Sequence, residues 1–183
     1  MLERLTDAEL VRKARHDEPA AWRVLVRRHT PMVYRLALRT LRHPDDAEDA
    51  SQEVFVKMSK YLDSYDPTRP LAPWLGRITW HVCVKRLGDR RPETDALDEV
   101  SDEASPESAV ASRQAEVLLT RALDKLPAQD RFLIDLRYRE GISDVEVAEA
   151  TGMNVNTVRT RLFRARQALK KWLAPVLGKA EEA

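Results

Sequence analysis

The stretch GISDVEVAEATGMNVNTVRTRLFRARQALKKWL, residues 141–173, predicts two helices joined by a tight turn. Ser143 and Glu146 have the spacing of a capping box, which starts the first helix. Gly152 has the backbone freedom that a tight turn requires. Asn154 can cap the second helix, because its side-chain oxygen accepts a hydrogen bond from a free backbone N–H group. Two helices connected in this way indicate a helix-turn-helix.

The second helix of this stretch has an apolar face and an opposite face that is polar and basic. Residues 150–180 contain seven Lys or Arg residues and no Asp or Glu. DNA phosphates attract such a surface, and in the major groove Arg pairs with guanine and Asn with adenine. A solvated basic helix in a bundle is the alternative, but the missing acids, the turn glycine and the cap together favour DNA binding. The apolar face comprises Val155, Val158, Leu162, Ala165, Leu169 and Trp172, and the opposite face Asn156, Arg159, Thr160, Arg164, Gln167 and Lys171.

Helix signals also dominate the rest of the 183-residue chain, which has five glycines and 6% aromatic residues. This composition favours helix over sheet. Several prolines stand where a first helical turn would begin. We therefore predict an all-α protein. The expected helices cover residues 6–16, begin at Pro19, Pro31 and Pro44, run from Pro73 through Leu87, and cover residues 119–126 and 129–140; the helix after Pro44 has its apolar stripe at Ala47, Ala50, Val54, Met58 and Tyr61.

Charge and composition divide the chain into three parts. Residues 1–92 carry a net charge of +5, residues 93–112 a net charge of −7, and residues 113–183 a net charge of +3. In the acidic part helical periodicity fails and Ser and Pro accumulate, which is typical of a linker. We predict two small helical domains, residues 1–91 and 113–183, joined by an acidic linker over residues 92–112.

Several functional classes lack the residues that they would need. No apolar stretch approaches the roughly 18 residues of a transmembrane helix, and the N-terminus has no signal-peptide pattern. A cytoplasmic location is therefore expected, and the lone Cys83 is predicted to be a small buried hydrophobe. There is no nucleotide-binding loop, metal-ligand spacing or nucleophile constellation, so we predict no cofactor, no metal and no catalysis. The four histidines are scattered, at His16, His29, His43 and His81.

The segment DDAEDASQEVFVKMSKYLDSYDPTRPLAPWLGRITWHV, residues 45–82, resembles region 2 of bacterial sigma factors. Residues 118–173 resemble region 4 of the same proteins. The motifs DAED..QEVF, WL.RI and LP..DR, followed by the helix-turn-helix, are specific in this order and spacing. The chain is therefore identified as similar to the extracytoplasmic-function (ECF) group of the sigma-70 family, which implies two helical domains.

The resemblance implies three sets of site residues. At three of these positions the chain departs from the family, which usually has asparagine in place of His81, often aspartate in place of Lys85, and often glycine in place of Asn156. The residues expected to bind core polymerase are Asp49, Gln52, Glu53, Val56 and Lys60. The residues expected at the −10 element are Tyr65, Asp66, Arg69, Arg77, His81, Lys85 and Arg86, with Tyr65 as a stacking surface for a flipped base. The residues expected at the −35 element are Asn154, Asn156, Thr157, Arg159, Thr160, Arg161, Arg164 and Lys171.

The function that this resemblance implies is that of an alternative sigma factor. Such a protein binds core RNA polymerase, through the clamp helices of the largest subunit and the flap of the beta subunit, and recognises and melts promoter DNA. The family also implies an anti-sigma factor as a regulatory partner, and no insertion into a membrane. A stand-alone helix-turn-helix regulator is the alternative, but it leaves the segment at residues 45–82 unexplained.

Overall fold

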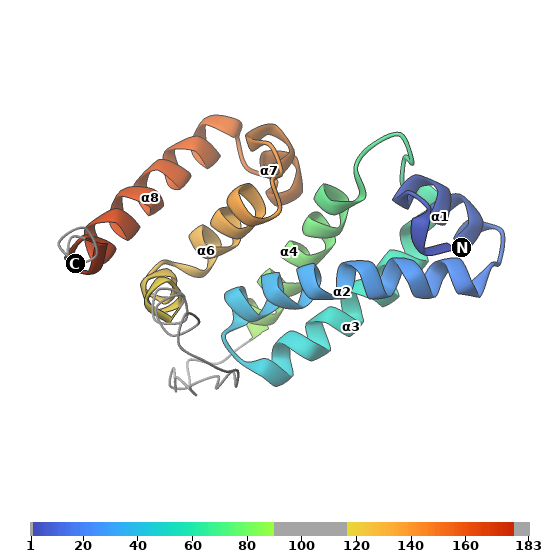
Figure 1. The fold of residues 1–183 in the computed structure, drawn as a ribbon, viewed down its shortest axis with the longest axis horizontal. Coiled ribbons are helices and arrows are strands. Elements are labelled where there is room, and N and C mark those ends of the chain that lie inside the picture. Colours follow the sequence, from blue (N-terminus) through green and yellow to red (C-terminus); the bar gives the residue numbers. More distant parts are fainter. Residues whose placement is uncertain (1, 90–116, 178–183) are drawn as a thin grey trace.

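A computed structural model describes residues 2–89 and 117–177, and these residues form helices and no strand (Figure 1). The all-α prediction is thus confirmed for the described part of the chain. The predicted linker, residues 92–112, lies outside the described residues. The N-terminal half contains α1 (Asp7–Arg15), α2 (Pro19–Leu41), α3 (Pro44–Tyr61) and α4 (Leu71–Asp89), with short 3-10 turns η1 (Leu2–Arg4) and η2 (Leu62–Ser64). The C-terminal half contains a helical segment over residues 117–124, α6 (Ala128–Ile134), the π-helical turn η3 (Asp135–Arg139), α7 (Asp144–Thr151) and α8 (Val155–Leu177).

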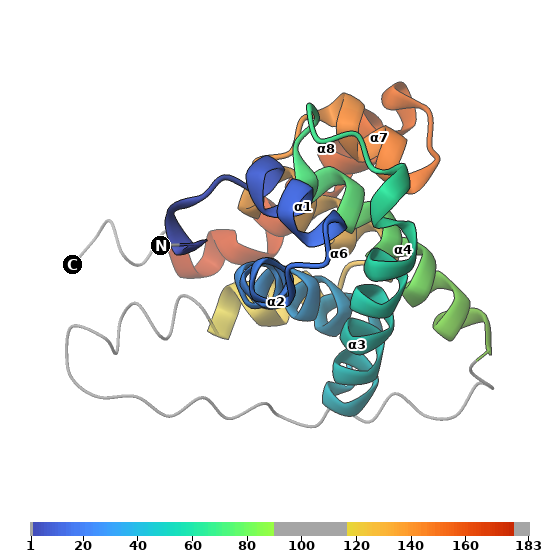
Figure 2. The same ribbon diagram turned by 90° about the vertical axis from the view of Figure 1, so that its right-hand side faces the viewer.

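The N-terminal half is a bundle built around α2. Figure 2 views α2 nearly end-on, with α1 and α3 on either side of it, and α4 also packs against both α2 and α3. The predicted capping box of α1 is present, because the Thr6 hydroxyl accepts from the Glu9 N–H group and the Glu9 carboxylate accepts from the Thr6 N–H group. Leu25, Leu36 and Leu75 are fully buried in the core between these helices.

Pro31 does not begin a separate helix, so this prediction was wrong. It lies inside α2, which continues through it from Pro19 to Leu41. Pro31 is exposed, so water can bond to the carbonyl that loses its helical N–H partner. Buried side chains on both sides of the proline, among them Leu25 and Val33, hold the two parts of the helix against the same neighbours.

Tyr61 does not belong to the apolar stripe of α3. The first four members of the predicted stripe are buried, but Tyr61 is 48% exposed. The reason is that α3 ends at Tyr61 and the chain tightens into η2, which turns Leu62 into the core in place of Tyr61.

The C-terminal half contains the predicted helix-turn-helix, formed by α7 and α8. Ser143 and Glu146 make the predicted capping box of α7. Gly152 ends that helix with a φ of 71°, in the left-handed region that favours glycine. The Asn154 side chain accepts from the Asn156 N–H group at 2.9 Å, which caps α8 as predicted. The helix expected over residues 129–140 is α6 followed by the π-helical turn η3.

The two halves pack against each other, with α4 beside α7 and α2 beside α6 (Figure 1). The Trp80 and Phe132 rings lie 4.9 Å apart across this contact. Gly76 lies so close to η3 that a Cβ atom there would come within 3.1 Å of Leu136 Cδ2. The buried Arg131 guanidinium donates from Nε to the Arg39 carbonyl of α2 at 2.6 Å. Apolar packing and a buried cation therefore join the halves.

Candidate nucleic-acid interface

A groove runs between α3 and α4 on the surface of the N-terminal half. Its volume is about 510 Å³, within the range of pockets that hold small organic ligands. The side chains that line it come from the end of α3, from η2 and from the outer face of α4. They are Glu53, Lys57, Tyr61, Ser64, Trp74, Arg77, Ile78, His81, Val82 and Lys85.

The groove combines aromatic rings with basic side chains. Tyr61 and Trp74 come from opposite walls, and the predicted residues Arg77, His81 and Lys85 follow one another along α4. The His81 Nδ1 atom lies 2.7 Å from the Arg77 carbonyl oxygen, which can only accept. Nδ1 therefore carries the proton, and Nε2 of the neutral ring is an acceptor that can meet an amino group of a base. Aromatic rings for stacking beside cations for phosphates are typical of single-strand nucleic-acid sites.

Tyr65 does not line the groove, and its predicted role as a stacking surface is contradicted by its burial. Its side chain is 4% exposed and its ring packs 5.0 Å from the ring of Trp74. Its hydroxyl donates to the Arg69 carbonyl. Burial raises the pKa of Tyr65 to about 12, so the hydroxyl stays protonated and keeps donating. Tyr65 supports the loop from inside, and Tyr61 offers the exposed ring in this region.

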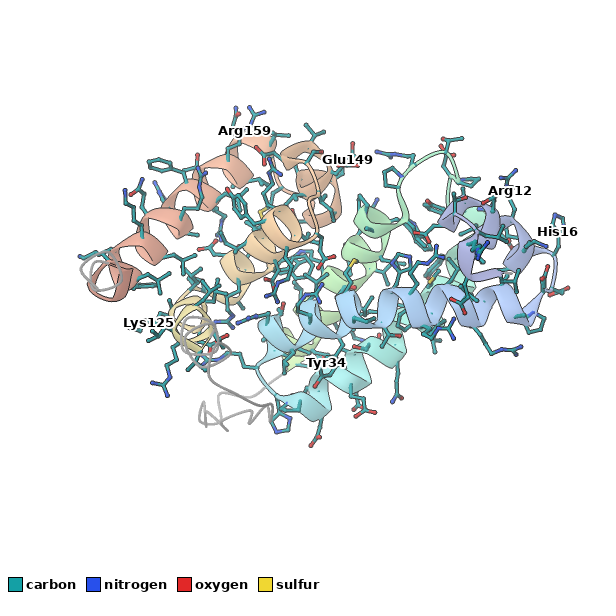
Figure 3. All side chains as sticks on the ribbon, in the orientation of Figure 1. Arg12, His16, Tyr34, Lys125, Glu149 and Arg159 are labelled. Atoms are coloured by element: carbon teal, nitrogen blue, oxygen red, sulfur yellow. The ribbon has the colours of Figure 1, made fainter. Side chains whose placement is uncertain are left out.

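The other predicted residues of this loop, Asp66 and Arg69, are exposed but already engaged. Asp66 accepts from the backbone N–H and the hydroxyl of Thr68, and the backbone bond holds its pKa below the usual range. Arg69 reaches across to the C-terminal half and donates to Glu149 of α7 at 2.6 Å. Figure 3 shows Glu149 on the side of α7 that faces this loop.

Arg86 was predicted to contact the −10 element, but it makes an internal ion pair. Its guanidinium lies 3.2 Å from the Glu53 carboxylate and 3.9 Å from that of Asp49, both on α3. The Arg86 side chain is mostly buried, and its Nε atom is shielded from solvent. Arg86 therefore ties α4 to α3 and does not face the groove with Lys85.

The residues predicted to bind polymerase lie along α3. Asp49, Gln52, Val56 and Lys60 are exposed, and Val56 is 69% exposed. Glu53 differs from them, because it turns toward Arg86 and lines the groove. The four exposed side chains are therefore accessible to a partner.

The residues predicted to meet the −35 element lie on α8 and its cap. Arg159 is exposed at the outer edge of α8 (Figure 3) and lies 3.4 Å from Asp144. Arg161 differs from the other residues, because it is only partly exposed and pairs with Asp130 of α6 at 2.6 Å. The remaining predicted residues are exposed: Asn154, Asn156, Thr157, Thr160, Arg164 and Lys171.

Comparisons with known proteins match both halves of the chain. A family model described as sigma-70 region 2 matches residues 25–93, and one described as sigma-70 region 4 matches residues 116–169. The ECF RNA polymerase sigma factor SigE of Mycolicibacterium smegmatis is 34% identical, over 94% of this chain and 74% of its own.

The chain belongs to the ECF sigma factors of the sigma-70 family.

Two further relatives resemble this sigma factor along nearly its full length. The ECF RNA polymerase sigma-E factor of Escherichia coli is 30% identical over 97% of this chain and 99% of its own. The solved structure of CnrH in complex with the cytosolic domain of CnrY superposes with a TM-score of 0.67 at 28% identity, over 92% of this chain and 97% of CnrH. Sigma factors are transcription initiation factors, and a stand-alone regulator would leave the region 2 match unexplained.

Three residues of this sigma factor were missed by sequence reasoning. Tyr61 was placed in an apolar stripe and Trp74 in none of the three sets of site residues, but both line the groove. Phe163 is 53% exposed on α8, between the predicted Arg159 and Arg164. A signal was available for Phe163, because one large apolar residue interrupts an otherwise polar helix face.

The described residues contain neither a cluster of potential metal ligands nor an exposed cysteine. Residues 2–89 and 117–177 contain no group of three His, Cys, Asp or Glu side chains placed to hold a metal ion. Cys83 is fully buried, as predicted, and burial raises its pKa to about 12. None of the described helices is long and apolar enough to cross a membrane.

Proposed function

We propose that this sigma factor holds an unpaired base of the −10 element in the groove between α3 and α4 and reads the −35 element as duplex with α8. The observation that carries this proposal is the groove itself, in which Tyr61 and Trp74 face cations from both walls. Stacking on an aromatic ring contributes roughly 1–3 kcal/mol per base. This energy helps to offset the few kcal/mol that removing a base from the duplex costs.

The proposed roles of the chain's parts follow the same division. Residues 1–91 form region 2, residues 113–183 form region 4, and residues 92–112 connect them. Asp49, Gln52, Val56 and Lys60 would bind the clamp helices of the largest polymerase subunit, and region 4 the beta-subunit flap. The protein supplies binding energy and no catalysis of its own, and it acts with polymerase in the cytoplasm. Because CnrH is solved in complex with the cytosolic domain of CnrY, we also propose an anti-sigma factor as a regulatory partner.

Reading both elements at once requires the two halves to separate. The −10 and −35 positions lie about 25 base pairs apart, or roughly 85 Å of duplex at ~3.4 Å per pair. A compact chain of 183 residues has a radius of gyration of only about 16 Å. The packed arrangement, with Arg69 bonded to Glu149, is therefore a state of the chain before both elements are bound.

The proposal is tested by replacing Tyr61 with alanine. Tyr61 is exposed, so the substitution should leave the fold intact. Permanganate footprinting of the holoenzyme should show promoter duplex opening slowed about tenfold, from the lost stacking. The defect should shrink on a template already melted at the −10 element. Val84→Ala is the matched control, because Val84 is exposed on α4 but does not line the groove. A Tyr61→Ala protein that opens duplex DNA at the wild-type rate would contradict the proposal.

A further inference from the structure

The loop between α3 and α4 is shaped by bonds within itself. The Asp66 carboxylate accepts from the Thr68 N–H group at 2.9 Å, and the Arg69 N–H group donates to the Asp66 carbonyl at 3.1 Å. The Tyr65 hydroxyl also donates to the Arg69 carbonyl. Each of these bonds joins two residues of the loop, so together they fix its shape but not its position relative to the helices.

Arg15, the last residue of α1, connects the loop to the body of the bundle. Its Nη2 atom donates to the Leu62 carbonyl at 2.6 Å and to the Asp63 carbonyl at 3.3 Å, and also donates to the Tyr65 carbonyl. Its Nε atom donates to the Leu62 carbonyl at 3.1 Å. The last carbonyls of a helix have no partner within the helix, and a cation is favourable beside them. One guanidinium therefore caps the end of α3 and holds the first residue of the loop.

Arg15 is itself held in a fixed position. The opposite end of α1 is bound to α2, because the Asp7 carboxylate accepts from Arg28 at 2.6 Å and lies 2.9 Å from His29 Nε2. The bond from His29 lowers the pKa of Asp7, so the carboxylate is charged near neutral pH. The Arg15 side chain is only 22% exposed. The Arg15 guanidinium therefore fixes the loop relative to α2, because α1 is bound to α2 at one end and to the loop at the other.

The turn that Arg15 holds adjoins Tyr61 on one wall of the groove and contacts Trp74 on the other. Tyr61 and Ser64 line the groove and flank the two η2 residues whose carbonyls Arg15 binds. Tyr65 packs against Trp74, which lines the groove from α4. Arg15 does not line the groove. A shift of this turn would change the separation of the Tyr61 and Trp74 rings without removing either one.

We propose that Arg15 is a positioning residue for base capture, which sets the separation of the Tyr61 and Trp74 rings before DNA arrives. Helix α1 then contributes to promoter opening although it does not touch the base. The inference rests on the proposed function of the groove. A turn that had to order itself on binding would lose part of the binding energy. Lysine cannot replace the planar arginine guanidinium, which donates hydrogen bonds to three carbonyls at once.

The test compares holoenzymes containing Arg15→Met, Arg15→Lys and the control Arg12→Met. Arg12 lies on the same helix, points away from the bundle in Figure 3, and donates within α1 to the Ala8 carbonyl at 3.3 Å. Opening is measured on a promoter duplex that the wild-type holoenzyme melts. It is measured again with single abasic sites placed in turn through the non-template strand of the −10 element.

On the intact duplex we expect Arg15→Met to slow opening about tenfold or more, since several hydrogen bonds to a charged group are lost. Arg15→Lys should be intermediate, and Arg12→Met should match the wild type. At one abasic position the wild type itself should open the promoter more slowly. On that template the opening rates of wild type and Arg15→Met should differ by no more than about twofold, because the groove then has no base to hold.

Two results would overturn the role of Arg15. One is wild-type opening by Arg15→Met, and the other is an equal defect on intact and abasic templates, which a purely structural role would produce. If circular dichroism shows that Arg15→Met does not fold, Arg15→Lys carries the same comparison. If the wild type shows no loss at any abasic position, the groove captures no base and the proposed function fails together with this inference. If an abasic site slows opening by the wild type, but the defect of the Arg15 variants is the same with and without that base, this inference alone is overturned.

Discussion

Replacing Arg131 with methionine should destabilise the protein and weaken the contact between its halves. The buried guanidinium donates to the Arg39 carbonyl at 2.6 Å and to the Thr40 carbonyl at 3.4 Å, both at the end of α2. It also donates to the Leu126 carbonyl at 2.6 Å and to the Asp124 carbonyl at 3.3 Å, which precede α6. Methionine has a similar length but no donor, so these bonds are lost while the space stays filled.

The size of the effect follows from the two short bonds. A hydrogen bond to a charged group contributes about 1.5–3 kcal/mol, so the two bonds at 2.6 Å together contribute roughly 3–6 kcal/mol. Removing a buried charge returns part of its desolvation penalty, on the order of 1–2 kcal/mol. The net loss in the free energy of unfolding should be about 2–4 kcal/mol. For a chain of this size each kcal/mol lowers the melting temperature by about 2–4 °C, so we expect a decrease of roughly 5–15 °C.

Equilibrium urea unfolding, followed in parallel by circular dichroism and tryptophan fluorescence, measures this loss. Arg121→Met is the matched control, because Arg121 is exposed on the helical segment before α6 and should be replaceable at almost no cost. If Arg131→Met unfolds within about 0.5 kcal/mol of the wild type, which is the scatter expected of surface changes, the carbonyl bonds do not stabilise the fold. The argument that Arg131 joins the halves would then be wrong.

Three further predictions concern the surfaces and the buried acid. Changing Gln52 and Val56 together to alanine should weaken co-elution with core polymerase about tenfold or more, from the loss of a buried apolar contact and a polar one; unchanged co-elution would remove α3 from the polymerase surface. In the wild type, replacing −35 thymines with deoxyuridine should lower the affinity for DNA, because the apolar Phe163 ring contacts the thymine methyl group. Phe163→Ala should abolish this loss of affinity, and a wild type whose affinity does not depend on the methyl group refutes this role. Burial raises the pKa of Asp135 above the usual range of an aspartate, so the stability that its protonation brings is present at low pH and lost as the pH rises through the raised pKa. The free energy of unfolding of Asp135→Asn relative to wild type should therefore increase as the pH rises in urea titrations, and a difference independent of pH would contradict this.

Features that depend on near neighbours in the sequence were predicted correctly. The capping boxes at Thr6 and Ser143 form because both partners lie three residues apart. Gly152 takes the left-handed conformation that its place after a short amphipathic helix requires. The inward face of α8 follows from helical spacing alone, with Val158 and Leu162 buried as expected.

The sequence could not show the position of a side chain where a distant partner decides it. Arg86 and Arg161 look like DNA-binding residues in the sequence, but each meets a carboxylate on another helix, at Glu53 and Asp130. Tyr65 was expected at the surface because nothing in its loop required burial, yet Trp74 offers a packing partner from the next helix. Spacing within one helix cannot reveal such partners, since they depend on how helices far apart in the sequence meet.

The close approach of Gly76 to Leu136 bears on how this gene can exchange segments with its relatives. Even a methyl group at position 76 would lie 3.1 Å from the Leu136 side chain, so alanine there would force α4 away from η3 or displace the leucine. A recombinant that joined this N-terminal half to a C-terminal half with a bulkier residue at that point would inherit a steric conflict. The side chains at positions 76 and 136 are therefore matched to each other in size, and a larger residue at either position requires the other to shift.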